Sequence, residues 1–309
     1  MSKISVLMAT YNGQKYILEQ LNSIYTQIKK PDEVIIIDDA STDKTVKIIN
    51  DFISKNKIDN WKVIVNEKNK GWKNNFMQGL KCCSGDYIFL SDQDDIWLDF
   101  KLAEMSLILD GNPEIMLLAS NYESMYEKNG DITKIKKMKN DGSVYKCPFD
   151  EKWLFVKRPG CVYALKRKLV EYIDTYSFTN YPHDAFLWRI AELLDGLYIF
   201  NKMTIRYRRH EKTATGHELK SGMSKIENMD YYLNAIKKAK IFVEAESIKN
   251  KNKKEKCIRM SEKWCELRKS ALTNANIVSW LKLMVYIRYY FNVRSWIADL
   301  IMLNDYKRN

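Results

Sequence analysis

The sequence predicts an α/β fold, with a mostly parallel sheet flanked by helices, followed by a C-terminal helical region. In the first half of the 309-residue chain, short and continuously apolar runs alternate with amphipathic segments of helical period. Continuously apolar strands are typical of parallel sheets that are buried on both faces. After Gly222 the sequence contains neither proline nor glycine. We therefore expect one domain over residues 1–222 and a helical region over residues 223–309.

The elements of the first half follow one another at short spacing. The strands are expected at 4–9, 33–39, 61–66 and 86–92, and the helices between them at 14–28, 41–53 and 75–83. The first helix has an apolar face formed by Ile17, Leu21, Ile24 and Ile28. The second opens with Ser41, Thr42 and Asp43, which are N-cap candidates.

The second half is less regular. A strand is expected at 114–122, a loop or hairpin at 127–142, a strand and a helix over 160–173 and 184–194, and two strands over 197–210 that turn at Asn201–Lys202. The most apolar stretch, 277–303, is interrupted by Lys282, Arg288, Arg294 and Asp299. A membrane span needs about 20 largely uncharged residues. We therefore expect two helices broken near Asn292, which pack on the main domain or lie on a membrane surface.

Composition narrows the classes of partner. The net charge of +12 favours an anionic partner, such as nucleic acid, a membrane surface or a phosphorylated substrate. None of the six cysteines forms a CxxC pair, so we expect reduced, structural thiols. The first residues lack the apolar length and cleavage site of a signal peptide, which predicts a cytoplasmic protein.

Polar turns follow all four strands of the first half, namely "ATYNG", "DDAST", "NEKNKG" and "SDQDD". Ligands of such sheets bind beyond the carboxyl ends of the strands, so these turns predict a binding site. The last turn holds Asp92, Asp94 and Asp95, whose carboxylates repel one another unless a cation joins them. Mg²⁺ or Mn²⁺ shared with phosphate oxygens is the natural counter-ion. We expect Asp95 to cap a helix that starts at about Ile96.

The segments "SVLMATYNG", "VIIIDDASTDKT" and "GDYIFLSDQDDIW" together resemble the family 2 glycosyltransferases, which are inverting enzymes of the Rossmann-like GT-A fold. The resemblance implies that Asp92-Gln93-Asp94 is the DXD motif, with Asp94 binding the metal of a nucleoside diphosphate and Asp92 lying near the ribose. It places Thr10, Tyr11 and Asn12 in the nucleotide pocket and lets Asp39 accept a hydrogen bond from a uracil or thymine base. Within "NKGWKNNF", Gly71 and Asn75 would complete the donor pocket.

The segment from Tyr181 to Gly216 is similar to the acceptor side of the same family. On the residues alone, Asp184 is better explained as an N-cap, but the resemblance makes it the catalytic base that deprotonates the acceptor hydroxyl. His210 would reach the metal or the diphosphate, and Arg208 the phosphates. Neighbouring strand residues face opposite sides, so Arg208 and Arg209 should point in different directions.

The motifs are most similar to those of bacterial rhamnosyltransferase-like members, which act on surface polysaccharides. A dTDP- or UDP-sugar donor, a glycan or lipid-linked acceptor and a Mn²⁺ or Mg²⁺ cofactor are implied. The sequence departs from the common pattern at Ala9, where proline is frequent, and at "NNF", where "ARN" is frequent. The second departure leaves any phosphate-binding arginine at that position in doubt. The resemblance ends at about Gly222.

Three other functions fit the sequence less well. A nucleic-acid-binding protein fits the basic charge, but acids at the ligand edge of the sheet would repel phosphate without a metal. A sugar-nucleotide pyrophosphorylase should carry a glycine-rich loop with a basic residue after the first strand, whereas "ATYNGQKY" has one glycine. A non-catalytic sugar-binding module is disfavoured by the retention of Asp92, Asp94 and Asp184. We therefore expect a glycosyltransferase that does not bind nucleic acid.

Overall fold

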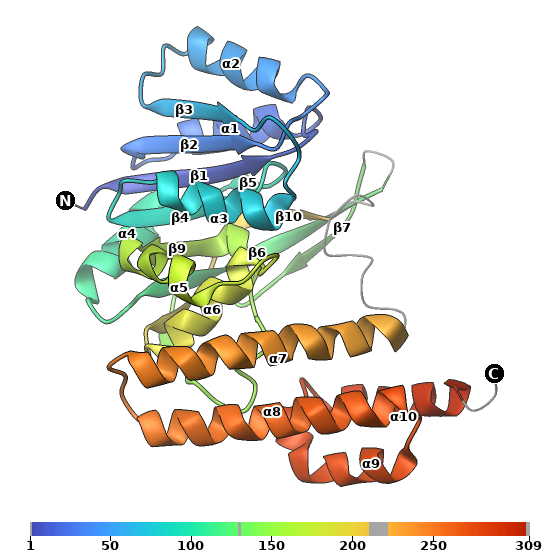
Figure 1. The fold of residues 1–309 in the computed structure, drawn as a ribbon. Coiled ribbons are helices and arrows are strands. Elements are labelled where there is room, and N and C mark those ends of the chain that lie inside the picture. Colours follow the sequence, from blue (N-terminus) through green and yellow to red (C-terminus); the bar gives the residue numbers. More distant parts are fainter. Residues whose placement is uncertain (1, 129–130, 210–221, 307–309) are drawn as a thin grey trace. The chain divides into compact units, whose positions relative to one another are not determined.

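The computed structural model describes residues 2–128, 131–209 and 222–306 (Figure 1). The chain divides into two compact units. The first unit comprises Met1–Cys147, Val156–Ala191 and Asp195–Glu211. The second, helical unit comprises Pro148–Phe155, Glu192–Leu194 and Lys212–Asn309. The helical unit therefore includes two short segments from earlier in the chain as well as the C-terminal helices.

The first unit is built on one mixed sheet, whose described strands follow the order β3-β2-β1-β4-β9-β6-β10-β5. In addition, β7 pairs with β6 and β8 pairs with β10. The strands are β1 (Ile4–Thr10), β2 (Glu33–Asp38), β3 (Trp61–Val65), β4 (Tyr87–Ser91), β5 (Ile96–Trp97), β6 (Leu117–Lys128), β7 (Asp131–Lys137), β8 (Val144–Lys146), β9 (Tyr163–Lys166) and β10 (Leu197–Arg209).

The parallel part of the sheet coincides with the four apolar runs of the first half. β1 pairs in parallel with β2 and with β4, and β2 pairs in parallel with β3. Every residue of β4 is buried, as continuous apolarity predicts. Further along the sheet, β9 lies antiparallel to both β4 and β6, whereas β6 and β10 are parallel. The prediction of a mostly parallel α/β sheet is confirmed for the first half of the chain.

Helices cover both faces of the parallel strands (Figure 1). α3 packs on β1 and β2, and α1 contacts α2 and β5. In α1 the apolar face is formed by Ile17, Leu21 and Ile24, while Ile28 lies beyond the end of the helix and is 69% exposed, contrary to the prediction. The helices of this part are α1 (Ile17–Tyr25), α2 (Thr45–Lys55), α3 (Trp72–Cys82), α4 (Lys101–Gly111), η1 (Gly160–Val162), η2 (Arg167–Tyr172), α5 (Ile173–Tyr176) and α6 (His183–Leu193).

Two local predictions are wrong. Residues 197–209 form one strand, β10, rather than two strands with a turn. Its pairing with β6 shifts register between Phe200 and Ile205, so the polar Asn201–Lys202 pair is accommodated as an irregularity within the ladder. Asp95 does not start a helix, because β10 takes Ile96–Trp97 into the sheet as β5, and α4 begins only at Lys101.

The second unit consists mainly of α7 (Gly222–Ala245), α8 (Lys251–Thr273), α9 (Ile277–Lys282), η3 (Leu283–Tyr289) and α10 (Val293–Tyr306). The predicted break near Asn292 is confirmed, since α10 starts at the following residue. Asp299 lies buried in this unit and accepts two hydrogen bonds from Arg268, at 2.7 and 2.9 Å, and one from the Tyr290 hydroxyl. This buried cluster ties α8 and α10 to the residue that follows η3.

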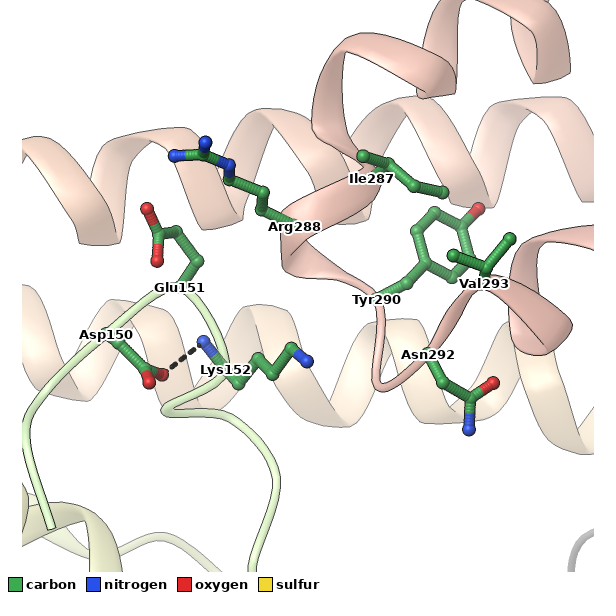
Figure 2. Close-up of a pocket in the computed structure, with 8 residues that line it drawn as sticks. All are labelled: Asp150, Glu151, Lys152, Ile287, Arg288, Tyr290, Asn292 and Val293. Carbon is green, nitrogen blue, oxygen red and sulfur yellow. Dashed lines mark hydrogen bonds between the residues drawn. The ribbon is translucent and has the colours of Figure 1, made fainter.

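A pocket of about 310 Å³ lies within the helical unit (Figure 2). It is lined by Asp150, Glu151, Lys152, Ile287, Arg288, Tyr290, Asn292 and Val293. Its lining carries charges of both signs, and none of the predicted site residues belongs to it. No helix among residues 2–128, 131–209 and 222–306 is long and apolar enough to cross a membrane.

Candidate functional site

The turns that follow β1, β2 and β4 lie at one edge of the sheet. The register places Thr10 beside Asp38 and Met8 beside Ser91, so the three strands end together. Residues 11–13, 39–41 and 92–95 continue directly from these ends. β3 ends at the same level, because Val65 lies beside Asp38. All four polar turns predicted from the sequence are thereby brought to the carboxyl edge of adjacent parallel strands, where ligands of such sheets bind.

Gln93 joins two of these turns. Its side chain accepts a hydrogen bond from the Tyr11 amide (2.8 Å) and donates one to the Tyr11 carbonyl (2.9 Å). Gly13 makes room for this bridge, because a Cβ atom there would lie 2.6 Å from Gln93 Cδ and still closer to Oε1. Gln93 therefore contacts the predicted nucleotide turn through the protein backbone.

The residues after β1 differ in their accessibility. Thr10 is buried, and its hydroxyl donates to the Asp38 carboxylate at 2.7 Å. Asn12 adopts a positive φ of 47°, and its side-chain oxygen accepts a hydrogen bond from the Thr42 amide at 2.9 Å. The Tyr11 side chain is 46% exposed. Tyr11 and Asn12 are thus accessible at the edge of the sheet, whereas Thr10 is buried and holds the end of β1 to Asp38.

Asp39 organises the turn between β3 and α3. Its carboxylate accepts hydrogen bonds from the amides of Lys70 and Gly71, both at 2.8 Å, and from the Asn66 side chain at 2.9 Å. The Asn66 amide also donates to the buried Asn75 side chain at 2.9 Å. Gly71 has a φ of 81°, a backbone conformation that favours glycine. The three predicted donor-pocket residues of this region, Asp39, Gly71 and Asn75, are therefore contiguous in space. Any hydrogen bond from a base to Asp39 would be added to three existing ones.

The acidic turn is a cluster of interacting carboxyl groups. Asp92 and Asp94 are half-buried and Asp95 is buried. Burial, and then the Asp94 and Asp184 carboxylates, raise the pKa of Asp92 to about 7. Burial, and then Asp94 and Asp92, raise the pKa of Asp95 well above its usual range. Charge on these groups is therefore disfavoured in the absence of a counter-ion.

The donor set of this cluster fits a hard divalent cation. Ligand atoms of Asp92, Asp95 and Cys161 lie within 4.8 Å of one another. One Asp95 oxygen, Oδ2, is buried without a hydrogen-bond partner among the described residues. Burial and the neighbouring acids raise the pKa of the Cys161 thiol, which makes it a poor ligand. Carboxylate oxygens are the ligands that Mg²⁺ and Mn²⁺ prefer, so Asp95 joins the predicted Asp94 and Asp92 as a candidate.

Lys101 lies buried behind the acids. Its ammonium donates to the Cys161 carbonyl at 2.8 Å and lies 4.1 Å from the centre of the Trp97 ring. Burial lowers the pKa of Lys101 to about 7, against the opposing attraction of Asp95 and Asp92. When protonated, the Lys101 ammonium offsets part of the negative charge of Asp92 and Asp95.

Arg208 has protein partners at each nitrogen of its guanidinium. It donates to the Asp94 carbonyl (2.9 Å), to Glu127 (3.0 Å) and to Glu19 (2.6 Å), and it is buried. Burial alone would raise the pKa of Glu127, but hydrogen bonds from Lys15, Tyr16 and Arg208 lower it to about 2. The prediction that Arg208 binds phosphate does not fit this arrangement, because its planar fork already holds two carboxylates. Arg209 instead lies over the rings of Tyr126 and Tyr207, so the two arginines point in different directions as predicted.

Asp184 stands at the start of α6, as predicted, and is half-buried. It interacts electrostatically with Asp92, which brings the predicted base to the acidic turn. The adjacent His183 is buried and stacked on Phe76, with ring centres 3.9 Å apart. Gly160 allows this approach, because a Cβ there would lie 2.6 Å from His183 Nε2 and 3.2 Å from Asp184 Cβ. Close packing therefore fixes where α6 begins relative to the sheet.

His210, the second predicted metal ligand, lies outside the described residues. The structure adds Asp95, Lys101, Glu127 and Gly160 to the residues expected from the sequence. The signal for Asp95 was present in its position next to Asp94. Lysine and glutamate are rarely buried, so nothing local in the sequence indicated that Lys101 and Glu127 lie inside.

Comparisons with known proteins agree with this geometry. The family model described as glycosyl transferase family 2 matches residues 5–179. The dTDP-rhamnosyl transferase RfbG of Shigella flexneri is 32% identical over 222 residues, which cover 68% of this chain and 73% of RfbG.

Two solved structures show the same fold. Residues 1–349 of Staphylococcus aureus TarS, solved with UDP-GlcNAc, superpose with a TM-score of 0.62 at 21% identity, covering 83% of this chain and 70% of that one. The mannosyltransferase PcManGT of Pyrobaculum calidifontis, solved with GDP-Man and Mn²⁺, gives a TM-score of 0.56 at 16% identity, covering 98% and 85%. The fold is the GT-A fold of glycosyltransferases. With the family model matched over more than half of its length, the chain belongs to the family 2 glycosyltransferases and is a glycosyltransferase that acts on nucleotide sugars.

Proposed function

We propose that this protein is an inverting, divalent-metal-dependent glycosyltransferase that transfers a sugar from a dTDP- or UDP-sugar to a bacterial surface polysaccharide or a lipid-linked acceptor. The observation that carries the proposal is the position of Asp184 at the start of α6. A Cβ atom at Gly160 would lie 3.2 Å from Asp184 Cβ, and the next residue, Cys161, has its thiol within 4.8 Å of a carboxylate oxygen of Asp92 in the turn after β4. This arrangement supports one site that contains both an acid cluster for a metal–diphosphate and a separate carboxylate for the acceptor.

The donor side of the site is assigned to the turns at the sheet edge. Tyr11 and Asn12 contact the nucleoside, and Asp39, with Gly71 and Asn75, shapes the pocket for the base. Gln93 holds the first of these turns through its two hydrogen bonds to Tyr11. Asp92, Asp94 and Asp95 hold Mn²⁺ or Mg²⁺, with His210 as a further candidate. When bound, such an ion supplies positive charge that stabilises a departing diphosphate.

Asp184 acts as the general base. An inverting transfer needs one group that removes the proton from the acceptor hydroxyl as the hydroxyl oxygen attacks the anomeric carbon. Asp184 stands in the first turn of α6, where the helix dipole favours an acidic side chain. Arg208 acts indirectly in this scheme, since its contact with the Asp94 carbonyl holds the acidic turn in place.

The likeness to RfbG supports a rhamnosyl donor, because that relative is described as a dTDP-rhamnosyl transferase and matches 68% of this chain. A UDP-hexose or UDP-HexNAc donor is the second candidate, supported by the structural likeness to TarS, which was solved with UDP-GlcNAc. Both donors place a pyrimidine base at Asp39. Measuring hydrolysis over a panel of sugar nucleotides decides between them.

A thermal-shift titration tests the proposal. dTDP or UDP with Mn²⁺ or Mg²⁺ should raise the melting temperature, and the shift should vanish with EDTA. The Asp184→Asn variant should retain this metal-dependent shift and lose transfer, because it removes only the base. Asp94→Asn should lose the shift. No response of the wild-type protein to any pairing of nucleotide and divalent metal would reject the metal-dependent mechanism, and loss of nucleotide binding in Asp184→Asn would reject the base assignment.

A further inference from the structure

The surface of α9, η3 and α10 carries two stripes of exposed apolar side chains. Ile277, Leu281 and Val285 form the first stripe, and Val293, Ile297 and Ile301 form the second. Each of these six side chains is between 41% and 81% exposed. The four-residue spacing of the second stripe, and of Ile277 and Leu281 in α9, is that of one α-helix face. Val285 follows in the 3-10 helix η3 and is the most exposed of the six. We call these six residues the apolar face.

A pair of tryptophans joins the two stripes. Trp280 and Trp296 stack with ring centres 4.2 Å apart and planes 9° apart, and the Trp280 indole donates to the Trp296 carbonyl at 3.0 Å. At about 100° per residue, each stripe is offset by roughly a quarter turn from its tryptophan, in the same sense on both helices. α9 and α10 lie against each other, with the chain reversing through η3 (Figure 1). In such a helical hairpin, equal offsets place Ile277 and Leu281 on the same side as the second stripe.

The exposed charges within residues 277–303 have one sign, although Val293 also lines the pocket that holds Asp150 and Glu151. Residues 277–303 contain a single acid, Asp299, which is buried and paired with Arg268. Lys282 and Arg294, by contrast, are exposed on the same two helices. Arg288 is also exposed, and it borders the pocket of Figure 2, where Asp150 and Glu151 lie. Residues 277–303 therefore present apolar side chains and cations, and the one carboxylate of this range is withdrawn from the surface.

We propose that the apolar face docks this protein onto the surface of a bilayer that contains anionic lipids. Apolar side chains flanked by lysine and arginine match the boundary between acyl chains and anionic headgroups. A second copy of the chain is a poorer occupant. A symmetric dimer would bring the same patch against itself, so Lys282 and Arg294 of one copy would face those of the other without an acid from this face to pair with them.

The protein lies on the membrane in this arrangement, because no described helix is able to cross it. The inference rests on the helical unit alone and does not depend on the proposed donor chemistry. A failure of vesicle binding would therefore leave the transfer reaction untouched, and a failure of nucleotide binding would leave the docking surface untouched.

The test is sedimentation of the full chain with phosphatidylcholine vesicles, with and without phosphatidylglycerol. We expect binding only to the anionic vesicles, and weakening of that binding by salt. The variant Val285→Ser/Ile297→Ser should lose most of the binding. The matched control is Leu107→Ser/Ile28→Ser, which removes two apolar side chains of the other unit that are 72% and 69% exposed. This control should bind like the wild type.

The charges are tested separately. Lys282→Gln/Arg294→Gln should lower the partition coefficient by roughly fivefold for each cation removed, or about 25-fold in total. Its control is Lys253→Gln/Lys256→Gln, which removes two exposed cations from α8. Equal losses in variant and control would mean that net charge, and not this face, drives binding, and would overturn the proposal.

Three further outcomes overturn it. The first is absence of sedimentation with any vesicle, and the second is equal sedimentation with neutral and anionic vesicles. The third is a wild-type protein that does not bind vesicles but forms a dimer in light scattering, if Val285→Ser/Ile297→Ser dissociates that dimer. Circular dichroism and urea unfolding of each variant show whether the helical unit is intact. All substituted side chains are exposed, so we expect unfolding free energies within about 0.5 kcal/mol of the wild type.

Discussion

His183 should make the protein lose stability in mild acid. Its ring is buried between Phe76 and Trp72, and neither ring nitrogen has a hydrogen-bond partner among the described residues. Burial lowers its pKa from 6.5 to about 4, and the Asp184 charge opposes this only in part. Protonation of the folded chain would place an unpaired cation among aromatic rings, whereas the unfolded chain binds the proton freely.

The size and direction of the effect follow from these two values. Between pH 4 and 6.5 the unfolded state binds more protons than the folded state, so the free energy of unfolding falls as the pH drops through this window. The contribution of His183 is complete above pH 6.5. A shift from 6.5 to about 4 corresponds to about 3 kcal/mol in total, of which about 2 kcal/mol is lost between pH 7 and pH 5.

Urea unfolding at pH 5, 6, 7 and 8 measures this loss. The variant His183→Leu removes both nitrogens, and His183→Gln is a second variant that does not titrate. Each should flatten the dependence of the unfolding free energy on pH by about 2 kcal/mol between pH 7 and 5 relative to the wild type. Asp92 and Asp95 also titrate anomalously, but they are present in all three proteins and cancel in the difference. Identical pH dependence in the three proteins would refute the reasoning.

Three other substitutions probe the edge of the sheet. Gly13→Ala should displace the Gln93 side chain and destabilise the protein by about 1–2 kcal/mol in urea unfolding, and a double variant with Gln93→Ala should recover part of that loss. Arg208→Lys should weaken metal-dependent nucleotide binding about tenfold in calorimetry, because a lysine cannot hold all three partners, while Arg206→Lys, at a more exposed strand neighbour, should not. Lys101→Met should cost about 3 kcal/mol of unfolding free energy, since it leaves a buried carbonyl and carboxylates without their cation.

Each substitution has an outcome that contradicts its premise. Equal losses in Gly13→Ala with and without Gln93→Ala would show that crowding of Gln93 is not the cause. Equal nucleotide affinity in Arg208→Lys and wild type would mean that the acidic turn holds its shape without the arginine fork. A Lys101→Met protein as stable as wild type would show that the acids carry too little charge to need a buried cation.

The sheet was predictable because its parallel strands are defined by continuous apolarity, a property that each strand carries locally. The local failures share one cause, which is a partner distant in the sequence. Ile96–Trp97 becomes β5 only because β10, more than 100 residues later, pairs with it, so Asp95 is not released to cap a helix. Ile28 continues the apolar period of α1, but the helix ends at Tyr25.

The candidate site divides in the same way. Asp92, Asp94 and Asp39 follow strands, and their position at the edge could be read from the sequence. The ion pairs of Arg208 could not be predicted from the sequence, because its partners Glu19 and Glu127 lie in two other elements. The role of Asp184 as catalytic base was predicted from similarity to a family and stays a prediction. The structure adds that its charge contributes to the raised pKa of Asp92.

The hydrogen bonds from Gln93 to the Tyr11 backbone couple the two turns to which we assign the nucleotide and the cation. A ligand that orders the acidic turn would also order the turn after β1 through these hydrogen bonds. The protein would then lose less conformational entropy when the second ligand binds. Reciprocity then requires that a cation strengthen nucleotide binding by the same factor by which the nucleotide strengthens cation binding. One amide side chain, which forms no part of the reacting groups, would thus set how cooperatively the donor complex assembles.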